Sequence, residues 1–241
     1  MRSAAVYVRD SHALATAIHT RAPTRKITGV SRHAHEERLA LASLLEAVGP
    51  DHPTLCTGWT SGDLAAHLVL RERRPDAAAG ILVPQLAGHT AAVQRQLREQ
   101  HTYEELVRLF REGPPRWSVF NVPGVDEAAN LTEHFVHLED VRRAAAGWEP
   151  RDLSAGMSSQ LWERLRRGGR LFFRRVPGGI TLRRTDTGDT AVARTGEPHV
   201  EISGLPGELM VYAFNRKDQA RVDMTGDPDL VAKLSTTRLG L

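Results

Sequence analysis

The chain has 241 residues, and its 32 basic and 29 acidic side chains give a formal net charge of +3. This length is enough for one large or two modest domains, and 41% of hydrophobic residues is ordinary for a globular protein. No apolar run approaches the roughly 18 residues of a membrane span, and no stripe of Lys and Arg alternates with aromatic residues. We therefore expect neither a membrane nor a nucleic acid among its partners.

The single cysteine, Cys56, excludes an intrachain disulfide and a cysteine-rich zinc site. This cysteine usage suits the reducing cytoplasm, where we expect the protein to reside. Almost all basic residues are arginine and alanine is abundant, which is typical of a GC-rich bacterial genome. Ten of the eleven histidines lie within residues 1–137, and this asymmetry indicates two parts with different roles.

Residues 1–29 differ in character from the rest of the chain, with five basic residues, one acidic residue and scattered Thr, Ser and Pro. The apolar stretch AAVYV is too short for a signal peptide. We expect a disordered extension here. The alternatives are a true start of translation near Val30 and, least favoured, an arginine-rich transit peptide.

Helical periodicity begins at Ser31 and continues to Gly147 without a strand pattern. Thr60, with Asp63 three residues later, has the pattern of a capping box, and Thr102 is a second candidate N-cap. Helices joined by loops with no intervening strand predict an antiparallel bundle. The helical stretches are HEERLALASLLEAVG, CTGWTSGDLAAHLVLRERR, PQLAGHTAAVQRQLREQ from Pro84, YEELVRLFREG, and a long helix from about Asp126 to Gly147.

The pattern changes after the segment GWEPRDLSAG, so we place a domain boundary near residues 148–155. A helix near 156–168 precedes the β-like runs RLFFRR, GGITLRRT, TAVART and HVEISG, separated by glycines and DTGD. PGELMVYAFNR and DPDLVAKLST have helical patterns, and ARVDMTG between them has that of a strand. We therefore expect an α+β fold with three segments: the extension 1–29, a helical bundle over 30–148, and an α+β domain over 149–241.

The stretch NLTEHFVHLED in the last bundle helix contains a Glu-x-x-x-His pair. Residues four apart lie on one face of an α-helix, so Glu133 and His137 can offer two ligands to one metal ion. The pair lies at the margin of the apolar arc of this helix. A solvated pair at the edge of a bundle is the commoner explanation for such spacing, and spacing alone leaves both interpretations open.

His67 lies between two leucines on its own helix, so we expect it to point towards the core, where a lone histidine is more often hydrogen-bonded than a ligand. If the two helix faces converge, His67 completes a three-ligand N/N/O set with Glu133 and His137, with open positions for water or substrate. His134 and Asp140 are then outer partners of the ligands, or surface residues.

Two further features carry no site prediction. Cys56 has no accompanying set of catalytic residues in the sequence, and we interpret it as a small packing residue. The stretch RERRPD, residues 71–76, has the pattern of a solvated helix end.

The motifs LCTGWTSGDLAAHLVLRERRPDAA and EHFVHLEDVRRA together resemble the actinobacterial metal-binding family related to mycothiol-dependent maleylpyruvate isomerase. This family belongs to the wider DinB-like group of four-helix bundles, and the likeness spans about Ser31 to Leu241. The resemblance implies a DinB-like four-helix bundle with a smaller, sterol-carrier-like C-terminal α+β domain. It also implies a divalent metal held by His67, Glu133 and His137, and the N/N/O chemistry of these ligands makes zinc the expected ion.

The isomerases of this family use a low-molecular-weight thiol, mycothiol, and a bound divalent ion favours the thiolate that adds to an activated double bond. The resemblance implies a mycothiol-dependent isomerase or thiol transferase acting on a small electrophilic substrate. The relatives carry an arginine after a glycine at the end of a C-terminal-domain helix. Here Arg216 follows Asn215 instead, and it is the candidate catalytic residue, suited to a substrate carboxylate.

The alternative is a non-catalytic metal-binding protein, or a carrier whose C-terminal domain holds a small apolar ligand. Neither the substrate nor the oligomeric state follows from the sequence.

Overall fold

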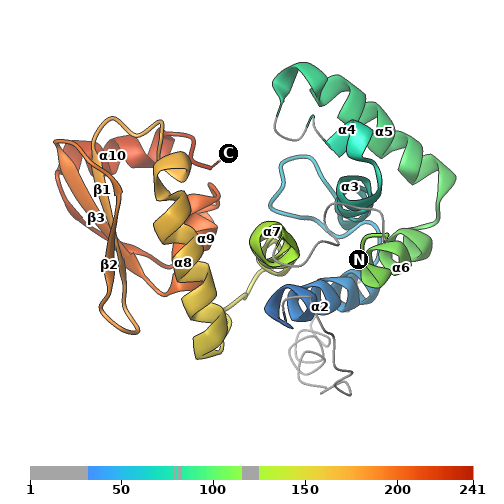
Figure 1. Ribbon diagram of the computed structural model, residues 1–241, viewed down its shortest axis with the longest axis horizontal. Coiled ribbons are helices and arrows are strands. Elements are labelled where there is room, and N and C mark those ends of the chain that lie inside the picture. The colour runs from blue at the N-terminus through green and yellow to red at the C-terminus, as the bar shows by residue number, and fades with distance from the viewer. Residues whose placement is uncertain (1–31, 79, 81–82, 116–124, 241) are drawn as a thin grey trace, which may run out of the picture.

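The computed structural model describes residues 32–78, 80, 83–115 and 125–240 (Figure 1). The extension expected over residues 1–29 lies outside this range. Among the described residues, no helix combines the length and the apolar character needed to cross a membrane.

Helices make up the N-terminal half, as the periodicity predicts. Thr102 caps one of them, because its hydroxyl accepts a hydrogen bond from the backbone N–H of Glu105, and Glu105 bonds back to the Thr102 N–H at 2.9 Å. The elements are α2 (Arg32–Val48), α3 (Ser61–Arg73), the short α4 (Pro75–Ala78), the 3₁₀ turn η3 (Pro84–Leu86), α5 (Ala87–Gln100), α6 (Tyr103–Glu112) and α7 (Val125–Arg142).

A four-stranded sheet with order β2-β1-β3-β4 forms the C-terminal half. The central pair, β1 and β3, is parallel, and each is antiparallel to its outer neighbour. Alternate residues of the central strands are buried beneath helices, as a half-covered sheet requires. The elements are α8 (Ala155–Phe172), β1 (Gly179–Arg184), β2 (Thr190–Arg194), β3 (His199–Gly204), α9 (Pro206–Ala213), the 3₁₀ turn η5 (Lys217–Gln219), β4 (Asp223–Gly226) and α10 (Pro228–Thr236).

The structure corrects one prediction. The stretch RLFFRR is not the β-like run that its sequence predicts, because Leu171 and Phe172 continue α8. The reason is that Leu161, Leu165 and Phe172 keep the helical spacing of a single buried face. The helix therefore ends later than residue 168, and α7 ends at Arg142, earlier than the expected Gly147.

Helix α7 lies at the centre of the molecule, between the bundle helices on one side and α8 and α9 on the other (Figure 1). Leu138 and Val141 pack in the core of the helical half. Leu131, Phe135 and Val136 pack in the core beneath the sheet. One helix thus forms a wall of both cores.

Buried ion pairs join the two halves beside this helix. The Arg143 guanidinium donates to Glu139 at 2.5 Å and to Glu208 on α9 at 2.6 and 2.9 Å. Arg151 donates to Glu139 at 2.6 Å and to Glu37 on α2 at 2.8 and 3.0 Å. Arg143 therefore joins Glu139 of α7 to the sheet half, and Arg151 joins the same carboxylate to α2 of the bundle.

Candidate metal centre

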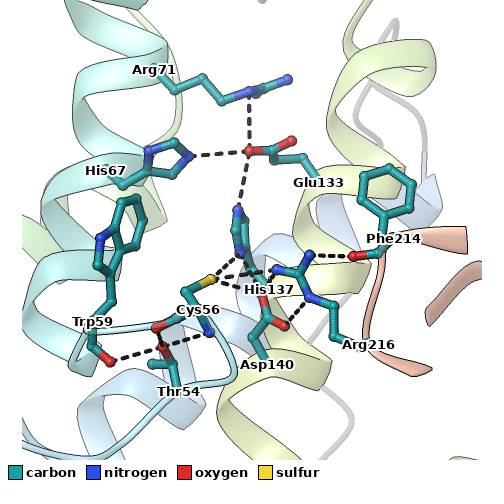
Figure 2. A network of polar contacts seen from close by, with 10 residues as sticks. All are labelled: Thr54, Cys56, Trp59, His67, Arg71, Glu133, His137, Asp140, Phe214 and Arg216. Carbon is teal, nitrogen blue, oxygen red and sulfur yellow. Dashed lines mark hydrogen bonds and ion pairs between the residues drawn. The ribbon is translucent and has the colours of Figure 1, made fainter. Parts of the chain in front are cut away.

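The candidate site lies where α3, α7, the loop before α3 and the turn after α9 meet (Figure 2). The predicted capping box fixes the start of α3. The Asp63 carboxylate accepts one hydrogen bond from the backbone N–H of Thr60 at 3.0 Å and another from the Thr60 hydroxyl at 3.1 Å. The loop is tied to α7 by a hydrogen bond of 3.0 Å from the Leu55 N–H to the Asp140 carbonyl oxygen.

Three side chains point their ligand atoms at one another. Nε2 of His67 lies 3.3 Å from Oε1 of Glu133, and Nε2 of His137 lies 3.2 Å from the same oxygen. All three atoms are within 4.8 Å of one another, and the two histidine rings meet edge to face with centroids 5.4 Å apart. The structure therefore brings together the three residues that the sequence singled out as a ligand set.

The donor set fits a small divalent ion. Zn–N and Zn–O bonds of roughly 2.0–2.1 Å in a tetrahedral arrangement place neighbouring ligand atoms about 3.3–3.4 Å apart, close to the two distances to Glu133. Two neutral imidazole nitrogens and one carboxylate form the borderline set typical of zinc. His67 is suited to this role, because burial lowers its pKa and keeps the ring neutral near pH 7.

Proton exchange accompanies any filling of this set. Burial opposes charge on His137, but hydrogen bonds to Asp140, Cys56 and Glu133 outweigh it and raise its pKa well above the ordinary value. Burial likewise opposes charge on Glu133, yet hydrogen bonds from His137 and His67 lower its pKa well below the usual range. A protonated His137 thus donates to a carboxylate on either side, Asp140 through Nδ1 and Glu133 through Nε2. A cation that binds Nε2 would have to displace the proton from that atom.

Asp140 orients His137 from the outside. Its Oδ2 accepts a hydrogen bond of 2.9 Å from Nδ1 of His137, which leaves Nε2 aimed at Glu133. Arg216 donates to both oxygens of the same carboxylate at 2.7 Å. Despite burial, these hydrogen bonds lower the pKa of Asp140 to about 2, so the carboxylate stays ionised. This is the carboxylate–histidine arrangement that fixes the tautomer of metal ligands.

Cys56 lies in this cluster, which corrects its interpretation as an isolated packing residue. Its thiol donates to Asp140 at 3.2 Å, and the sulfur lies 4.0 Å from Nδ1 of His137 and 3.5 Å from Nη2 of Arg216. Cys56, His137 and Asp140 form a second group with metal-ligand spacing. It shares His137 with the first group and contains an Asp140 already paired with a guanidinium, which disfavours a second cation there.

The stretch RERRPD is also not simply a solvated helix end. Arg71 and Glu72 are buried. The Nε of Arg71 lies 3.6 Å from Oε1 of Glu133, and Arg71 also donates to Asn130 on α7. Arg71 is four residues after His67, so both reach Glu133 from the same face of α3.

His134 points away from the candidate ligands. It is fully buried about 60° around α7 from His137, where Nδ1 lies 3.1 Å from the Ala34 carbonyl oxygen and Nε2 lies 3.5 Å from Glu72. It is neither a surface residue nor an outer partner of the site.

The fold and this site together define a class: a helical bundle with convergent His, Glu and His side chains, joined to a small α+β unit. No protein-family model matches the chain, and no curated protein sequence does. Two solved structures share its fold. One is mycothiol-dependent maleylpyruvate isomerase, with a TM-score of 0.50 and 17% identity over 81% of this chain and 91% of that one. The other is a histidine-to-alanine variant of that isomerase, with a TM-score of 0.55 and 16% identity over the same shares.

At this level of identity the likeness shows a common fold. It confirms the predicted α+β architecture, and it confirms the resemblance drawn from the motifs at the level of structure.

Proposed function

We propose that the protein is a metal-dependent enzyme that uses a low-molecular-weight thiol, of the mycothiol-dependent isomerase or thiol-transferase kind, and acts on a small electrophilic substrate. The observation that carries the proposal is the convergence of His67, Glu133 and His137 in a fold shared with mycothiol-dependent maleylpyruvate isomerase. Three protein ligands leave coordination positions for water or substrate, which is the pattern of catalytic rather than structural zinc sites.

These three residues would hold a divalent ion, zinc by the chemistry of the set. A bound ion supplies positive charge that lowers the pKa of a coordinated thiol and so favours the thiolate. The chain's own part is orientation: Asp140 holds the Nδ1 proton of His137, which leaves Nε2 for the ion. Trp59 packs against the His67 ring with centroids 5.1 Å apart and limits its movement.

Arg216 would provide the positive charge for an anionic group of the substrate. Burial acts to lower its pKa, but the hydrogen bonds and charge of Asp140 raise it, so the guanidinium stays charged. Its side chain retains 21% exposure, and Asp140 holds one edge of the guanidinium in a fixed orientation. A charged hydrogen bond to a substrate carboxylate would contribute ~1.5–3 kcal/mol of binding.

Metal analysis of the purified protein, followed by thiol-dependence assays on a panel of electrophiles, tests the proposal. We expect about one divalent ion per chain at the three-ligand set, and turnover only when both ion and thiol are present. Turnover without thiol would contradict the mechanism. A fully loaded protein that converts no electrophile with any thiol supports instead a metal-binding or carrier role without catalysis.

A further inference from the structure

Helix α9 ends in a turn that reverses the chain just before Arg216. The Asn215 N–H donates to the Tyr212 carbonyl oxygen at 2.9 Å, and the Arg216 N–H donates to the Val211 carbonyl oxygen at 3.2 Å. These two hydrogen bonds form a Schellman motif, in which the reversing residue adopts the left-handed conformation. That residue is Asn215, with a φ of 68°. The direction in which the chain presents Arg216 therefore depends on how firmly Asn215 is held.

The Asn215 side chain ties this turn to another part of the fold. Glycine is the usual residue at this position of the motif, because a Cβ atom makes the left-handed conformation costly, and asparagine sometimes replaces it. Here the amide oxygen of Asn215 accepts a hydrogen bond of 2.9 Å from the backbone N–H of Leu239. Leu239 is buried in the core beneath the sheet. Asparagine thus forms a bond to the core that glycine cannot form.

The segment after α10, residues 237–240, is itself fixed to the end of α8. The Gly240 N–H donates to the Phe172 carbonyl oxygen at 3.1 Å. The Arg174 guanidinium donates to the Gly240 carbonyl oxygen, also at 3.1 Å. Since Leu239 is buried and Gly240 is bonded through both its N–H and its carbonyl group, this segment is an anchored support for Asn215.

Lys217 makes a second connection on the other side of Arg216. Its ammonium group donates to the carbonyl oxygens of Leu234 and Thr237, each at 2.5 Å. These carbonyl groups lie at the end of α10 and just after it. The residues before and after Arg216 are therefore both bonded to α10 or to the segment that follows it.

The Arg216 side chain extends from this anchored turn to α7, where Asp140 accepts two hydrogen bonds from it at 2.7 Å (Figure 2). Another N–H of the guanidinium donates to the Phe214 carbonyl oxygen at 2.6 Å, within the turn. We propose that Asn215 is a positioning residue for Arg216, because its bond to Leu239 keeps the guanidinium at Asp140. The consequence for turnover rests on the proposed function, in which Arg216 receives an anionic group of the substrate.

Three variants test the bond between Asn215 and Leu239. Asn215→Gly permits the same left-handed turn but removes the side-chain acceptor, whereas Asn215→Asp keeps an acceptor for the Leu239 N–H. Asp218→Asn, an exposed change in η5, is the matched control. Asn215 is exposed as well, so none of these changes disturbs a core.

The readout is the solvent exchange of the Arg216 Nε–H, which donates to Asp140, in ¹⁵N-labelled protein; Arg216→Lys assigns the signal. We expect exchange about two- to tenfold faster in Asn215→Gly, the effect of one lost hydrogen bond, and within about twofold of wild type in Asn215→Asp and Asp218→Asn. Unchanged exchange in Asn215→Gly, or equally fast exchange in Asn215→Asp, would overturn the proposal. So would a wild-type Nε–H that exchanges as fast as that of the exposed Arg170.

Kinetics give a second readout and separate this proposal from the proposed function. Asn215→Gly should raise KM for an anionic substrate about two- to tenfold with kcat nearly unchanged, and Asn215→Asp should restore KM. Equal KM in Asn215→Gly and wild type would contradict the positioning role in substrate binding. If no electrophile is converted, the proposed function fails, and the exchange rates still decide whether Asn215 positions Arg216.

Discussion

Arg216, from the turn after α9, forms a bidentate ion pair with Asp140 on α7, with both N–O distances at 2.7 Å. The pair crosses from the sheet half to the helical half, 76 residues apart in sequence. Asp140 also orients His137 through its Nδ1 atom. Arg216 of the C-terminal half therefore influences, through Asp140, the orientation of a candidate ligand in the N-terminal half.

The three candidate ligands should each be needed for metal binding. We expect His67→Ala, Glu133→Ala and His137→Ala to weaken affinity by at least about a hundredfold, more than the ~10–100-fold typical of outer partners. His134→Ala is the matched control on α7. It should lower thermal stability, because His134 is fully buried, and leave the metal content unchanged. Metal loss in His134→Ala with retention in His137→Ala would reject the ligand set.

Asp140→Asn should weaken metal binding about 10–100-fold although every ligand remains, because the amide no longer fixes the His137 tautomer. Competition with a chromophoric chelator measures the change. Asp76→Asn, which alters an exposed pair with Arg74, is the control and should have no effect. Equal affinity of Asp140→Asn and wild type would show that Asp140 serves the fold alone.

Metal affinity should rise with pH above 6.5, the ordinary pKa of histidine. The raised pKa of His137 keeps it protonated in the metal-free protein, so an ion must displace a proton until the pH passes that folded-state value. Calorimetry in buffers of different ionisation enthalpy counts the released protons. Binding independent of pH between 6 and 8 would contradict protonation of His137.

Acid should destabilise the metal-free protein through Asp140. Its pKa is lowered to about 2 in the folded chain, from an ordinary 3.8, so its contribution is present above about pH 4 and is lost as the pH falls towards 2. The shift corresponds to about 2 kcal/mol. Urea unfolding at pH values from 2 to 6 gives the free energy of unfolding at each pH. This free energy should rise less steeply with pH in Asp140→Asn than in wild type. The same dependence on pH in both proteins would rule out the depressed pKa.

If the reacting sulfur comes from an external thiol, Cys56→Ser should retain both metal and activity. Its hydroxyl can still donate to Asp140 and accept from Arg216, the two contacts of the thiol. Arg216→Ala should mainly raise KM, whereas Arg216→Lys should restore part of the substrate affinity. Loss of activity in Cys56→Ser with full metal content would instead assign the chemistry to this cysteine.

The buried pair of Arg143 and Glu208 should matter far more than a surface pair. Glu208→Ala leaves the Arg143 guanidinium partly uncompensated and should cost about 3–5 kcal/mol of unfolding free energy. Glu163→Ala, which removes an exposed pair with Arg166, should change stability very little. Similar denaturation midpoints for the two variants would contradict the importance of this link.

Local pattern was enough to predict much of the fold. Helical periodicity and caps such as Thr102 depend on neighbours within a few residues, as do the alternating strands. The boundary expected near residues 148–155 falls between α7 and α8 and stays a prediction. RLFFRR misled because a short apolar run suits either a buried helix or a strand, and only its phase with Leu161 and Leu165 marks it as helical.

The surroundings of the site were harder to predict. Asp140 stands three residues after His137, so their pairing was readable from helical spacing. Cys56 and Arg216 reach Asp140 from 84 and 76 residues away, and no local pattern encodes such contacts. The burial of Arg71 depends on α7 packing over α3, which the charged stretch RERRPD does not reveal.

The central position of α7 has a consequence for the lifetime of the protein. This helix contributes buried side chains to both cores and provides two of the three candidate ligands, so a bound ion would stabilise the hydrophobic packing on either side of it. A ligand that binds only the native state shifts the unfolding equilibrium of everything that unfolds with its site. Scarcity of the ion would then expose the whole chain to proteolysis, and cellular abundance would follow metal supply.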